Sequence, residues 1–282
     1  MKNNNNQKSV IITGCSSGIG YQAVKDLTAR GYDVIATARK PKDVDDLKAR
    51  GFFSLQLDLT DSNSIQLAFD NILEHTSGKI YGLFNNGAYG QAGAVEDLSR
   101  ELIMQQFDTN VFGWMELTNL VIPVMRKQNQ GRIIFNSSIL GLISLKFRGA
   151  YNASKYAIEG FADTLRLELY DTNIYVTLIE PGPIESQFRN NSYKIFQRTI
   201  KKERSIFSQE YLVAEKRLNK KESATPFTLP ATAVSSKLIH ALESNHPKAR
   251  YYVTFPTYLF AYLKRFLPIS ILDRLLLKIS NS

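Results

Sequence analysis

Short apolar runs alternate with amphipathic helical patterns over the first two thirds of the chain. Runs that end at glycine or polar residues are typical of buried strands. They stand at residues 9–13, 32–38, 52–59, 80–86, 131–138 and 174–182. The helical patterns between them stand at residues 23–31, 43–51, 61–76, 101–126 and 151–170. This alternation predicts an α/β fold: a doubly wound parallel sheet with right-handed crossovers and helices on both faces.

The last third departs from this alternation. We find no linker before residue 185, so we predict one domain over residues 9–282, preceded by a polar, disordered tail at residues 1–8. Residues 189–225 are basic and predict a helical lid over a substrate cleft, whose apolar side suits a lipophilic compound. Alternatively, its apolar side chains only anchor the segment to the domain. These side chains are Phe196, Ile200, Phe207, Tyr211 and Leu212.

Residues 257–282 predict a C-terminal elaboration of two short amphipathic helices divided by Pro268. One helical face joins four apolar residues, Leu272, Leu275, Leu276 and Ile279. Positive charge comes from Lys264, Arg265, Arg274 and Lys278. Such a segment can lie peripherally in an anionic membrane interface or pack on its own domain, and the pattern leaves both interpretations open.

Composition and charge narrow the class of protein. The 282 residues are 44% hydrophobic and 22% charged, as in ordinary globular domains. The formal net charge of +9 gathers in the last third. No aromatic-interleaved basic module accompanies it, so we expect no nucleic-acid partner. The polar start lacks a signal core and no apolar run is long enough to span a bilayer, which predicts a cytoplasmic protein.

Cysteine and histidine usage excludes two further classes. Cys15 is the single cysteine, so an internal disulfide framework is excluded. The three histidines, His75, His240 and His246, lie far apart without cysteine or carboxylate companions at ligand spacing. We therefore expect no metal site, because such sites need clustered ligands.

Three glycines stand between the first predicted strand and the first predicted helix. Gly14 permits a tight turn, Gly18 permits close approach of a pyrophosphate, and Gly20 permits close packing of helix on strand. The helix N-terminus adds amide groups and partial positive charge. The spacing is G-x-x-x-G-x-G rather than the common G-x-G-x-x-G. In this strand–turn–helix context it predicts a dinucleotide site.

The end of the second predicted strand bears on which dinucleotide is bound. Dinucleotide folds often place an acidic residue there for the ribose hydroxyls, whereas this chain has Ala38 followed by Arg39 and Lys40. A guanidinium can bind a 2′-phosphate with two charge-assisted hydrogen bonds. Arg39 therefore favours NADP(H) over NAD(H), unless it is only a surface residue.

Three residues are candidates for proton transfer. Ser138 stands at the end of a predicted strand, and Tyr151 and Lys155 lie four residues apart on one face of the following helix. A lone tyrosine–lysine pair at this spacing is common on solvated helix faces. The serine and the glycine turn make the combination far more specific.

With these motifs, residues 9 to about 190 resemble the short-chain dehydrogenase/reductase family. The resemblance rests on TGCSSGIG, LFNNGA, DTNVFG, Ser138, YNASK and EPGPIESQF. It implies a Rossmann-type domain in which Tyr151 is the catalytic acid/base, Ser138 polarises the substrate carbonyl and Lys155 binds the nicotinamide ribose. It further implies that Asn110 holds a water in the proton relay. A nearby ammonium and a cationic nicotinamide should both lower the pKa of Tyr151 from about 10.

The resemblance also implies a set of cofactor-binding positions. Asp58 would lie beside the adenine, Pro181 and Gly182 would line the nicotinamide pocket, and Ser186 stands where a threonine commonly reaches the carboxamide. The remaining expected positions are Gly14, Ser16, Ser17, Gly18, Ile19, Gly20, Arg39, Leu59, Asn86, Gly87, Tyr151, Lys155 and Ile184. The usual N-N-A-G reads here N-N-G-A, which puts Ala88 where a glycine with more backbone freedom is expected.

The sequence therefore predicts an NADP(H)-dependent oxidoreductase that interconverts a hydrophobic carbonyl compound and its alcohol, with retinoid- or steroid-like compounds included. The alternative is a regulatory protein that senses NADP(H) without turnover, and the complete catalytic set argues against it. A third, weaker alternative is a basic adaptor at a membrane surface. Family resemblance implies a homodimer or homotetramer, because the helices near residues 101–126 and 151–170 often form the subunit interface.

Overall fold

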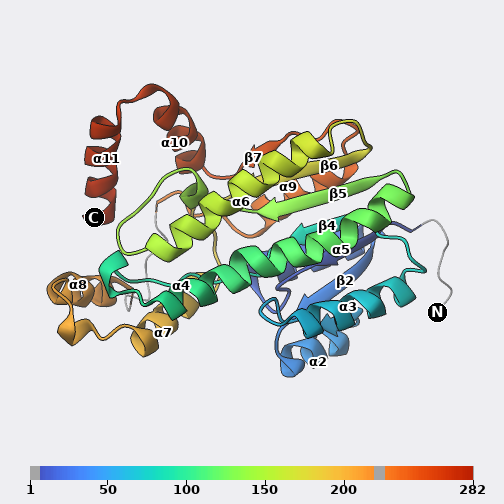
Figure 1. Cartoon of the computed structure of the whole chain (residues 1–282), viewed down its shortest axis with the longest axis horizontal. Helices are drawn as coiled ribbons and strands as arrows, with labels where there is room; N and C mark the ends of the chain where they lie inside the picture. Colours follow the sequence, from blue (N-terminus) through green and yellow to red (C-terminus); the bar gives the residue numbers. More distant parts are fainter. Residues whose placement is uncertain (1–6, 219–225, 282) are drawn as a thin grey trace.

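The computed structural model describes residues 7–218 and 226–281. Most of the predicted N-terminal tail and the end of the predicted lid lie outside these residues. One parallel sheet forms the centre of the molecule, in the order β3-β2-β1-β4-β5-β6-β7 (Figure 1). In that order its strands are β3 (Ser54–Gln56), β2 (Asp33–Ala38), β1 (Ser9–Ile12), β4 (Gly82–Asn85), β5 (Gly131–Asn136), β6 (Ile174–Glu180) and β7 (Arg250–Tyr252). The predicted fold class is confirmed.

Helices cover both faces of the sheet because each strand carries apolar side chains on both sides. One face packs against α1 (Gly18–Ala29), α2 (Pro41–Ala49) and α9 (Thr232–Glu243). The other packs against α3 (Ser62–His75), α5 (Gly113–Lys127) and α6 (Gly149–Glu168). The chain order reverses between β1 and β4, so these two strands flank the point where open α/β sheets bind ligands.

The stretch predicted as one helix over residues 101–126 is two helices. α4 (Arg100–Phe107) and α5 are joined by a π-helical turn, η2 (Asp108–Phe112). Such turns break the regular i→i−4 ladder and are frequent at functional sites. This turn contains Asn110. Single turns of 3₁₀-helix stand at η1 (Val95–Asp97), η3 (Ile139–Gly141) and η4 (Lys202–Arg204).

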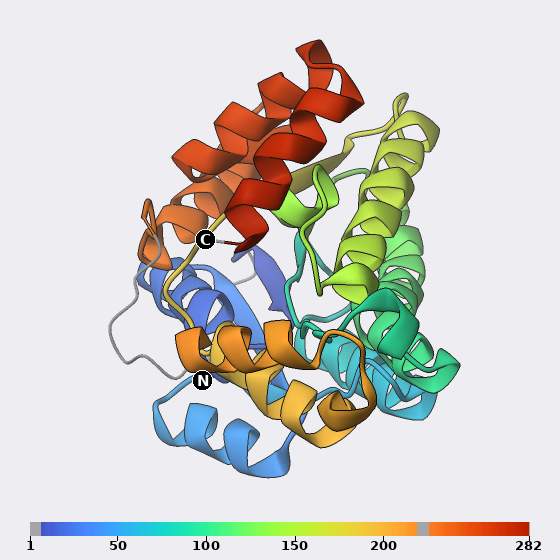
Figure 2. The ribbon, with the colours of Figure 1, turned by 90° about the vertical axis from the view of Figure 1, so that its left-hand side faces the viewer.

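Four helices of the C-terminal third lie beyond the carboxyl ends of the strands, as Figures 1 and 2 show. They are α7 (Phe188–Thr199), α8 (Ser208–Leu218), α10 (Phe255–Phe266) and α11 (Ile269–Asn281). Phe196, Ile200 and Tyr211 are buried against Ala94, Leu98 and Ala150. The sequence left open whether the apolar side chains of this segment face a substrate or only anchor the segment to the domain. These three side chains anchor it.

The predicted apolar face of the C-terminal helices is divided between two environments. Leu272 and Leu276 of α11 are buried against Leu140, Ile143 and Tyr151. Leu275 and Ile279 are 36% and 42% exposed. Of the two interpretations that the sequence left open, packing on the domain describes Leu272 and Leu276.

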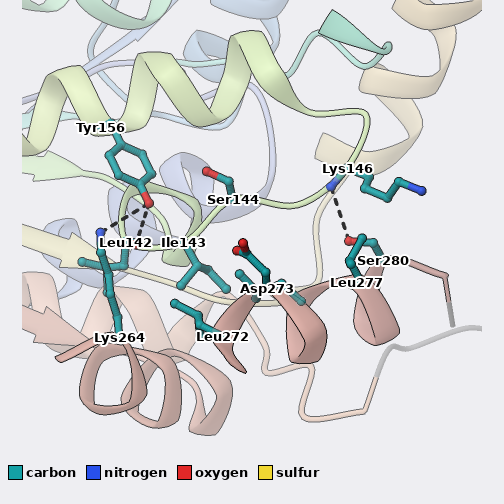
Figure 3. Close-up of a pocket in the computed structure, with 11 residues that line it drawn as sticks. Leu142, Ile143, Ser144, Lys146, Tyr156, Lys264, Leu272, Asp273, Leu277 and Ser280 are labelled. Carbon is teal, nitrogen blue, oxygen red and sulfur yellow. Dashed lines mark hydrogen bonds between the residues drawn. The ribbon is translucent and has the colours of Figure 1, made fainter. Parts of the chain in front are cut away.

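Two hydrogen bonds also join the C-terminal helices α10 and α11 to the rest of the domain (Figure 3). The Lys264 ammonium donates to the Tyr156 hydroxyl at 3.4 Å, and the Lys146 amide donates to Ser280 Oγ at 3.3 Å. Within the described residues, no helix is both long and apolar enough to cross a bilayer.

Candidate active site

Ser138 and Tyr151 meet beyond the end of β5. Ser138 stands two residues after the strand and caps η3, accepting a hydrogen bond from the Leu140 amide at 3.1 Å. Tyr151 stands in the first turn of α6, and its interaction with the Ser138 side chain lowers the pKa of the phenol. The structure thus brings together the two residues that the sequence places thirteen positions apart.

Lys155 lies one turn further along α6 and is 1% exposed. Its ammonium donates to the backbone oxygen of Asn136 at 2.7 Å and lies 4.4 Å from the centroid of the Trp114 ring and 5.7 Å from that of Tyr151. Burial lowers the pKa of Lys155 to about 7, and the Glu159 carboxylate opposes this shift. The lysine charge is therefore sensitive to its surroundings near neutral pH.

Tyr151 is protonated at neutral pH. Burial raises the pKa of Tyr151 to about 12, while Ser138 and the Arg148 guanidinium oppose the rise. The Phe188 ring packs on the phenol with centroids 5.2 Å apart. Burial outweighs these opposing charges in the protein alone, and the lowering of the Tyr151 pKa by a cationic nicotinamide stays a prediction. A protonated phenol in this position is suited to donating a proton.

Asn110 is fully buried and binds two neighbouring elements. Its Nδ2 donates to the Tyr89 oxygen at 2.9 Å and to Ser154 Oγ at 3.1 Å, while its Oδ1 accepts from the Tyr89 amide at 3.1 Å. Both side-chain donors are thereby used. Asn110 fastens the η2 turn to α6, beside the turn that carries Tyr151 and Lys155.

The glycine turn packs tightly against the end of β4. Gly14 and Gly18 have φ of 71° and 58°, the left-handed region that glycine adopts without strain. A side chain at Gly14 would meet the backbone of Gly87, and one at Gly20 would meet the Gly14 carbonyl. A methyl group at Gly18 would lie 3.1 Å from the Ser186 Cβ. The turn therefore requires glycine at all three positions.

Thr13 joins the two strand ends. Its hydroxyl accepts hydrogen bonds from the amides of Asn86 and Gly87, both at 2.8 Å. The Asn86 side-chain nitrogen, Nδ2, donates to the Thr13 backbone oxygen at 2.8 Å. Ala88 is absent from the described non-glycine residues with positive φ, so the exchanged N-N-G-A order imposes no backbone strain.

The other predicted cofactor positions surround this turn. Ser16, Ser17 and Ile19 belong to the turn and the first residues of α1, whose N-cap Ser17 makes no side-chain bond to the helix. Leu59 packs within 3.3 Å of where a Gly87 side chain would begin. Asp58 accepts from the Thr60 amide at 3.0 Å, and Arg39 is exposed at the end of β2.

The segment after β6 lies across the turn from the other side. The Pro181 oxygen accepts from the Ile139 amide at 2.8 Å, and Gly182 is pressed against the Thr254 hydroxyl. Ile184 forms a bridge with Leu229, and Ser186 then reaches Gly18. The predicted site residues outside α6 and η2 thus follow the carboxyl ends of the strands, from Asp58 after β3 and Arg39 after β2 to Pro181 after β6.

A family model described as short chain dehydrogenase matches residues 8–195. The chain belongs to the short-chain dehydrogenase family. It is 41% identical over 270 residues to "Uncharacterized oxidoreductase YbbO" of Escherichia coli (strain K12), covering 96% of this chain and 94% of that protein. It is 34% identical over 281 residues to "Retinol dehydrogenase 16" of Mus musculus, covering 95% and 87%.

Solved structures agree with the fold of this short-chain dehydrogenase. A crystal structure of a short-chain dehydrogenase from Streptomyces avermitilis matches with a TM-score of 0.76 at 25% identity, covering 95% of this chain and 98% of that one. The protein is therefore an oxidoreductase of a family that binds a nicotinamide cofactor.

The residues of this short-chain dehydrogenase fit a nicotinamide dinucleotide. The first-turn amides of a helix have no partner within the helix, and at α1 the N-cap side chain does not satisfy them. Glycines at three positions remove the side chains that would crowd this helix end. The combination provides amide donors and positive helix charge for a pyrophosphate.

Three residues beside the site were missed in the sequence. Phe188 covers Tyr151, Trp114 packs on the Lys155 ammonium, and Thr13 ties β1 to β4. Trp114 had a signal, since it is the single tryptophan and follows the DTNVFG motif. Phe188 is the last residue of the EPGPIESQF motif, but the motif does not specify its contact with Tyr151, which depends on how the following segment packs.

Two hollows beside the site are not lined by Ser138 or Tyr151. One of about 350 Å³ lies between α11 and the segment before α6, with Leu142, Tyr156 and Leu272 among its walls (Figure 3). The other, of about 530 Å³, is lined by Val95 and Asn152, among others.

Proposed function

We propose that this short-chain dehydrogenase interconverts a hydrophobic carbonyl compound and its alcohol with NADP(H), using Tyr151 as the acid/base. The observation that carries the proposal is the meeting of Ser138, Tyr151 and Lys155 beside the glycine turn. When bound, the nicotinamide supplies or accepts the hydride.

Each residue of the set has a distinct task. Tyr151, with a pKa raised to about 12 by burial, donates its proton to the carbonyl oxygen as negative charge develops there. Ser138 hydrogen-bonds the same oxygen and stabilises that charge. Lys155 binds the nicotinamide ribose, and its ammonium favours the phenolate left after proton donation. Asn110 holds the relay water through its backbone, since its side-chain donors are used.

NADP(H) rather than NAD(H) is the proposed cofactor. Arg39 is exposed at the end of β2, and the preceding Ala38 presents no carboxylate to repel a 2′-phosphate. Asp58 and Leu59 hold the adenine, and Pro181, Gly182 and Ser186 hold the nicotinamide side.

The substrate class follows from the walls around Tyr151. The phenol belongs to an apolar cluster with Leu140, Ile143 and Phe260, and Phe188 covers its ring. Apolar walls with one polar pair favour a lipophilic carbonyl compound, with retinoid- and steroid-like compounds as candidates. The segment that begins with α7 acts as the lid, with Phe188 as its point of contact.

Two kinds of association are proposed with this activity. Large apolar side chains are exposed on α4, on α6 and in the η2 turn, which supports a homodimer or homotetramer. They include Ile103, Met104, Phe112, Tyr156, Phe161 and Leu167.

The second association is peripheral contact with anionic lipid through α10. One side of this helix exposes Phe255, Tyr258, Leu259, Tyr262 and Phe266. Lys264, Arg265 and Arg274 are exposed on α10 and α11, so positive charge accompanies the apolar stripe. Aromatic side chains beside basic ones suit a membrane interface. The protein would then be cytoplasmic and peripheral to the membrane.

An NADPH-oxidation screen tests the enzymatic proposal. Purified protein is assayed with aliphatic, aromatic, retinoid and steroid carbonyl compounds, and each alcohol is assayed with NADP⁺. Turnover should increase with substrate hydrophobicity. NADPH binding without turnover of any compound would instead favour the alternative of an NADP(H)-sensing protein.

A further inference from the structure

A column of ionisable side chains runs along one face of α6 behind the proposed active site. Tyr151, Lys155, Glu159 and Asp163 are spaced four residues apart, which places each one helical turn beyond the last. Tyr151, Lys155 and Glu159 are 9%, 1% and 7% exposed, so the first three are buried. A buried carboxyl group thus follows the buried ammonium at neighbouring positions on the helix.

Arg250 of β7 gathers the acidic end of this column. Its Nη1 donates to Glu159, and also to Glu180 of β6 at 2.5 Å. Its Nη2 donates to Asp163 at 2.6 Å. One guanidinium therefore joins α6 to the two last strands of the sheet and holds the Glu159 carboxylate in place.

Glu159 is held from a second direction by the end of β5. The Ser137 hydroxyl donates to Glu159 Oε1. The residue before it, Asn136, accepts the hydrogen bond of Lys155. Two consecutive residues thus hold two successive members of the α6 column, and the next residue, Ser138, interacts with Tyr151. Gly141 closes over the pair, since a methyl group there would lie 3.0 Å from Glu159 Oε1.

The three acidic residues of this cluster differ in burial and in their partners. Burial, followed by the Glu159 charge, raises the pKa of Glu180 and so favours its neutral form. Asp163 is 41% exposed and has a second partner, Arg166, at 2.8 Å. Glu159 is the buried acidic residue one helical turn from Lys155 on α6, and it favours the charged form of that lysine.

We propose that Glu159 is a positioning residue that keeps Lys155 protonated for ribose binding and proton transfer, with Arg250 and Ser137 holding its carboxylate in place. This inference rests on the proposed function, because that function gives Lys155 its task. A buried ammonium by itself loses its proton readily, whereas an opposite charge one helical turn away favours the protonated form. Asn136 and Trp114 contact the ammonium but carry no charge that could substitute.

The competing explanation is purely structural: the cluster only fastens β7 and β6 to α6. The two explanations differ in what happens to Lys155. The charged and titratable groups around it are Tyr151 and Glu159 on its own helix, with Arg148 beyond Tyr151 and Arg250, Glu180 and Asp163 beyond Glu159. If the Glu159 charge acts on Lys155, removing that charge changes the titration midpoint of the lysine. If the cluster is purely structural, the midpoint stays the same.

The experiment titrates Lys155 directly in the cofactor-free protein. Lysine labelled with ¹³C at Cε is followed by NMR between pH 5 and pH 11, and the Lys155 resonance is assigned from its loss in Lys155→Met. Glu159→Gln keeps the shape of the side chain and removes its charge. The Lys155 midpoint should fall by at least about one pH unit. Glu159→Asp keeps the charge but withdraws it by one methylene, so its midpoint should lie between the two.

Two control variants separate charge from structure. Glu168→Gln removes the same charge from an exposed position on the same helix. Glu180→Gln removes a contact of the same arginine from a carboxyl group whose neutral form is favoured by burial. Neither should move the Lys155 midpoint, although Glu180→Gln should lower the melting temperature.

An unchanged Lys155 midpoint in folded Glu159→Gln overturns the proposal. If that variant does not fold, a midpoint in Glu159→Asp equal to that of the parent protein overturns it as well. The titration is independent of turnover, so a failed NADPH screen beside a shifted midpoint would contradict the enzymatic proposal alone. Turnover beside an unshifted midpoint would contradict only the role of Glu159. As a second readout, NADPH affinity in Glu159→Gln should decline at a lower pH than in the parent protein.

Discussion

Phe188 covers Tyr151: the two rings pack with centroids 5.2 Å apart and their planes 56° apart. This contact joins the first residue of α7 to the first turn of α6 and contributes to the burial that raises the pKa of Tyr151 to about 12. Phe188→Ala should therefore lower the titration midpoint of Tyr151 toward the reference value of about 10, because water regains access to the phenol.

The measurement is an NMR titration of ¹³C-labelled tyrosine, with the resonance assigned from Tyr151→Phe. Phe161→Ala is the control, since it removes a ring of the same size from an exposed position on α6 and should leave the midpoint unchanged. A midpoint that stays near 12 in Phe188→Ala would show that the rest of the site buries the phenol without help from α7.

Tyr151→Phe should abolish turnover while NADPH still binds. The ring and its contacts remain, and only the transferable proton is lost. General acid catalysis contributes roughly 10²–10⁴-fold, so kcat should fall by at least about 100-fold. NADPH affinity is measured separately by fluorescence, with Tyr170→Phe, an 81% exposed tyrosine at the end of α6, as control. A variant that retains more than about a tenth of the parent kcat would exclude Tyr151 as the proton donor.

The sequence predicted the fold because its apolar runs and glycine turn are local features with direct structural consequences. Ser138, Tyr151 and Lys155 are brought together by the strand–helix connection itself. Phe188 could not be predicted, because its contact with Tyr151 depends on how a segment after the sheet folds back.

The charge cluster on α6 had a partial signal in the sequence. The spacing of Tyr151, Lys155, Glu159 and Asp163 places them on one face. Arg250 stands 70 residues from Glu180 and 91 from Glu159, so only the pairing of β6 with β7 reveals that it joins them. The burial that raises the pKa of Tyr151 has no signal in the sequence for a related reason, because it depends on the packing of α7.

Cofactor preference should depend on the end of β2. Purified protein should bind NADPH more tightly than NADH, because Arg39 is exposed there and no carboxylate precedes it. Ala38→Asp combined with Arg39→Gln should reverse the order, since an acidic side chain binds the ribose hydroxyls and repels a 2′-phosphate. Dissociation constants for both cofactors are measured by fluorescence. Lys48→Gln, which removes a charge from the exposed side of α2, should change neither value. Equal affinities in the parent protein would contradict the proposed contact of Arg39.

Lys155 should make the stability of the protein depend on pH. Burial lowers the pKa of Lys155 to about 7 in the folded state, below its reference value of about 10.4 when unfolded. The folded state therefore binds fewer protons, and its stability falls as the pH falls from 10 to 7. Lys155→Met removes this penalty. The gain in unfolding free energy over the parent protein should be larger at pH 7 than at pH 10, by up to about 4 kcal/mol.

Urea denaturation of both proteins at the two pH values measures this difference. Lys237→Met on α9 is the control, because its side chain is exposed and its substitution should give the same difference at both pH values. A gain for Lys155→Met that is independent of pH would mean that the folded protein keeps the ammonium charged throughout this range.

The two faces of the C-terminal helices should respond differently to charge. Tyr262 and Phe266 are 60% and 74% exposed on the stripe of α10, whereas Leu276 is buried against the domain. If the stripe meets anionic lipid, the parent protein should co-sediment with anionic vesicles, and binding should weaken as salt rises. Tyr262→Glu combined with Phe266→Glu should abolish this binding and leave the melting temperature unchanged. Leu276→Glu should instead destabilise the fold by about 2–5 kcal/mol, because it places a charge in an apolar cluster.

Leu67→Glu supplies the matched control for the vesicle experiment. Leu67 is 66% exposed on α3, so its substitution adds the same charge to an equally open position away from the stripe. It should change neither sedimentation nor melting temperature. If the parent protein does not sediment with anionic vesicles, lipid does not cover the stripe. If, in addition, the α10 variant elutes as a smaller species on gel filtration, the stripe is covered by a second copy of the chain.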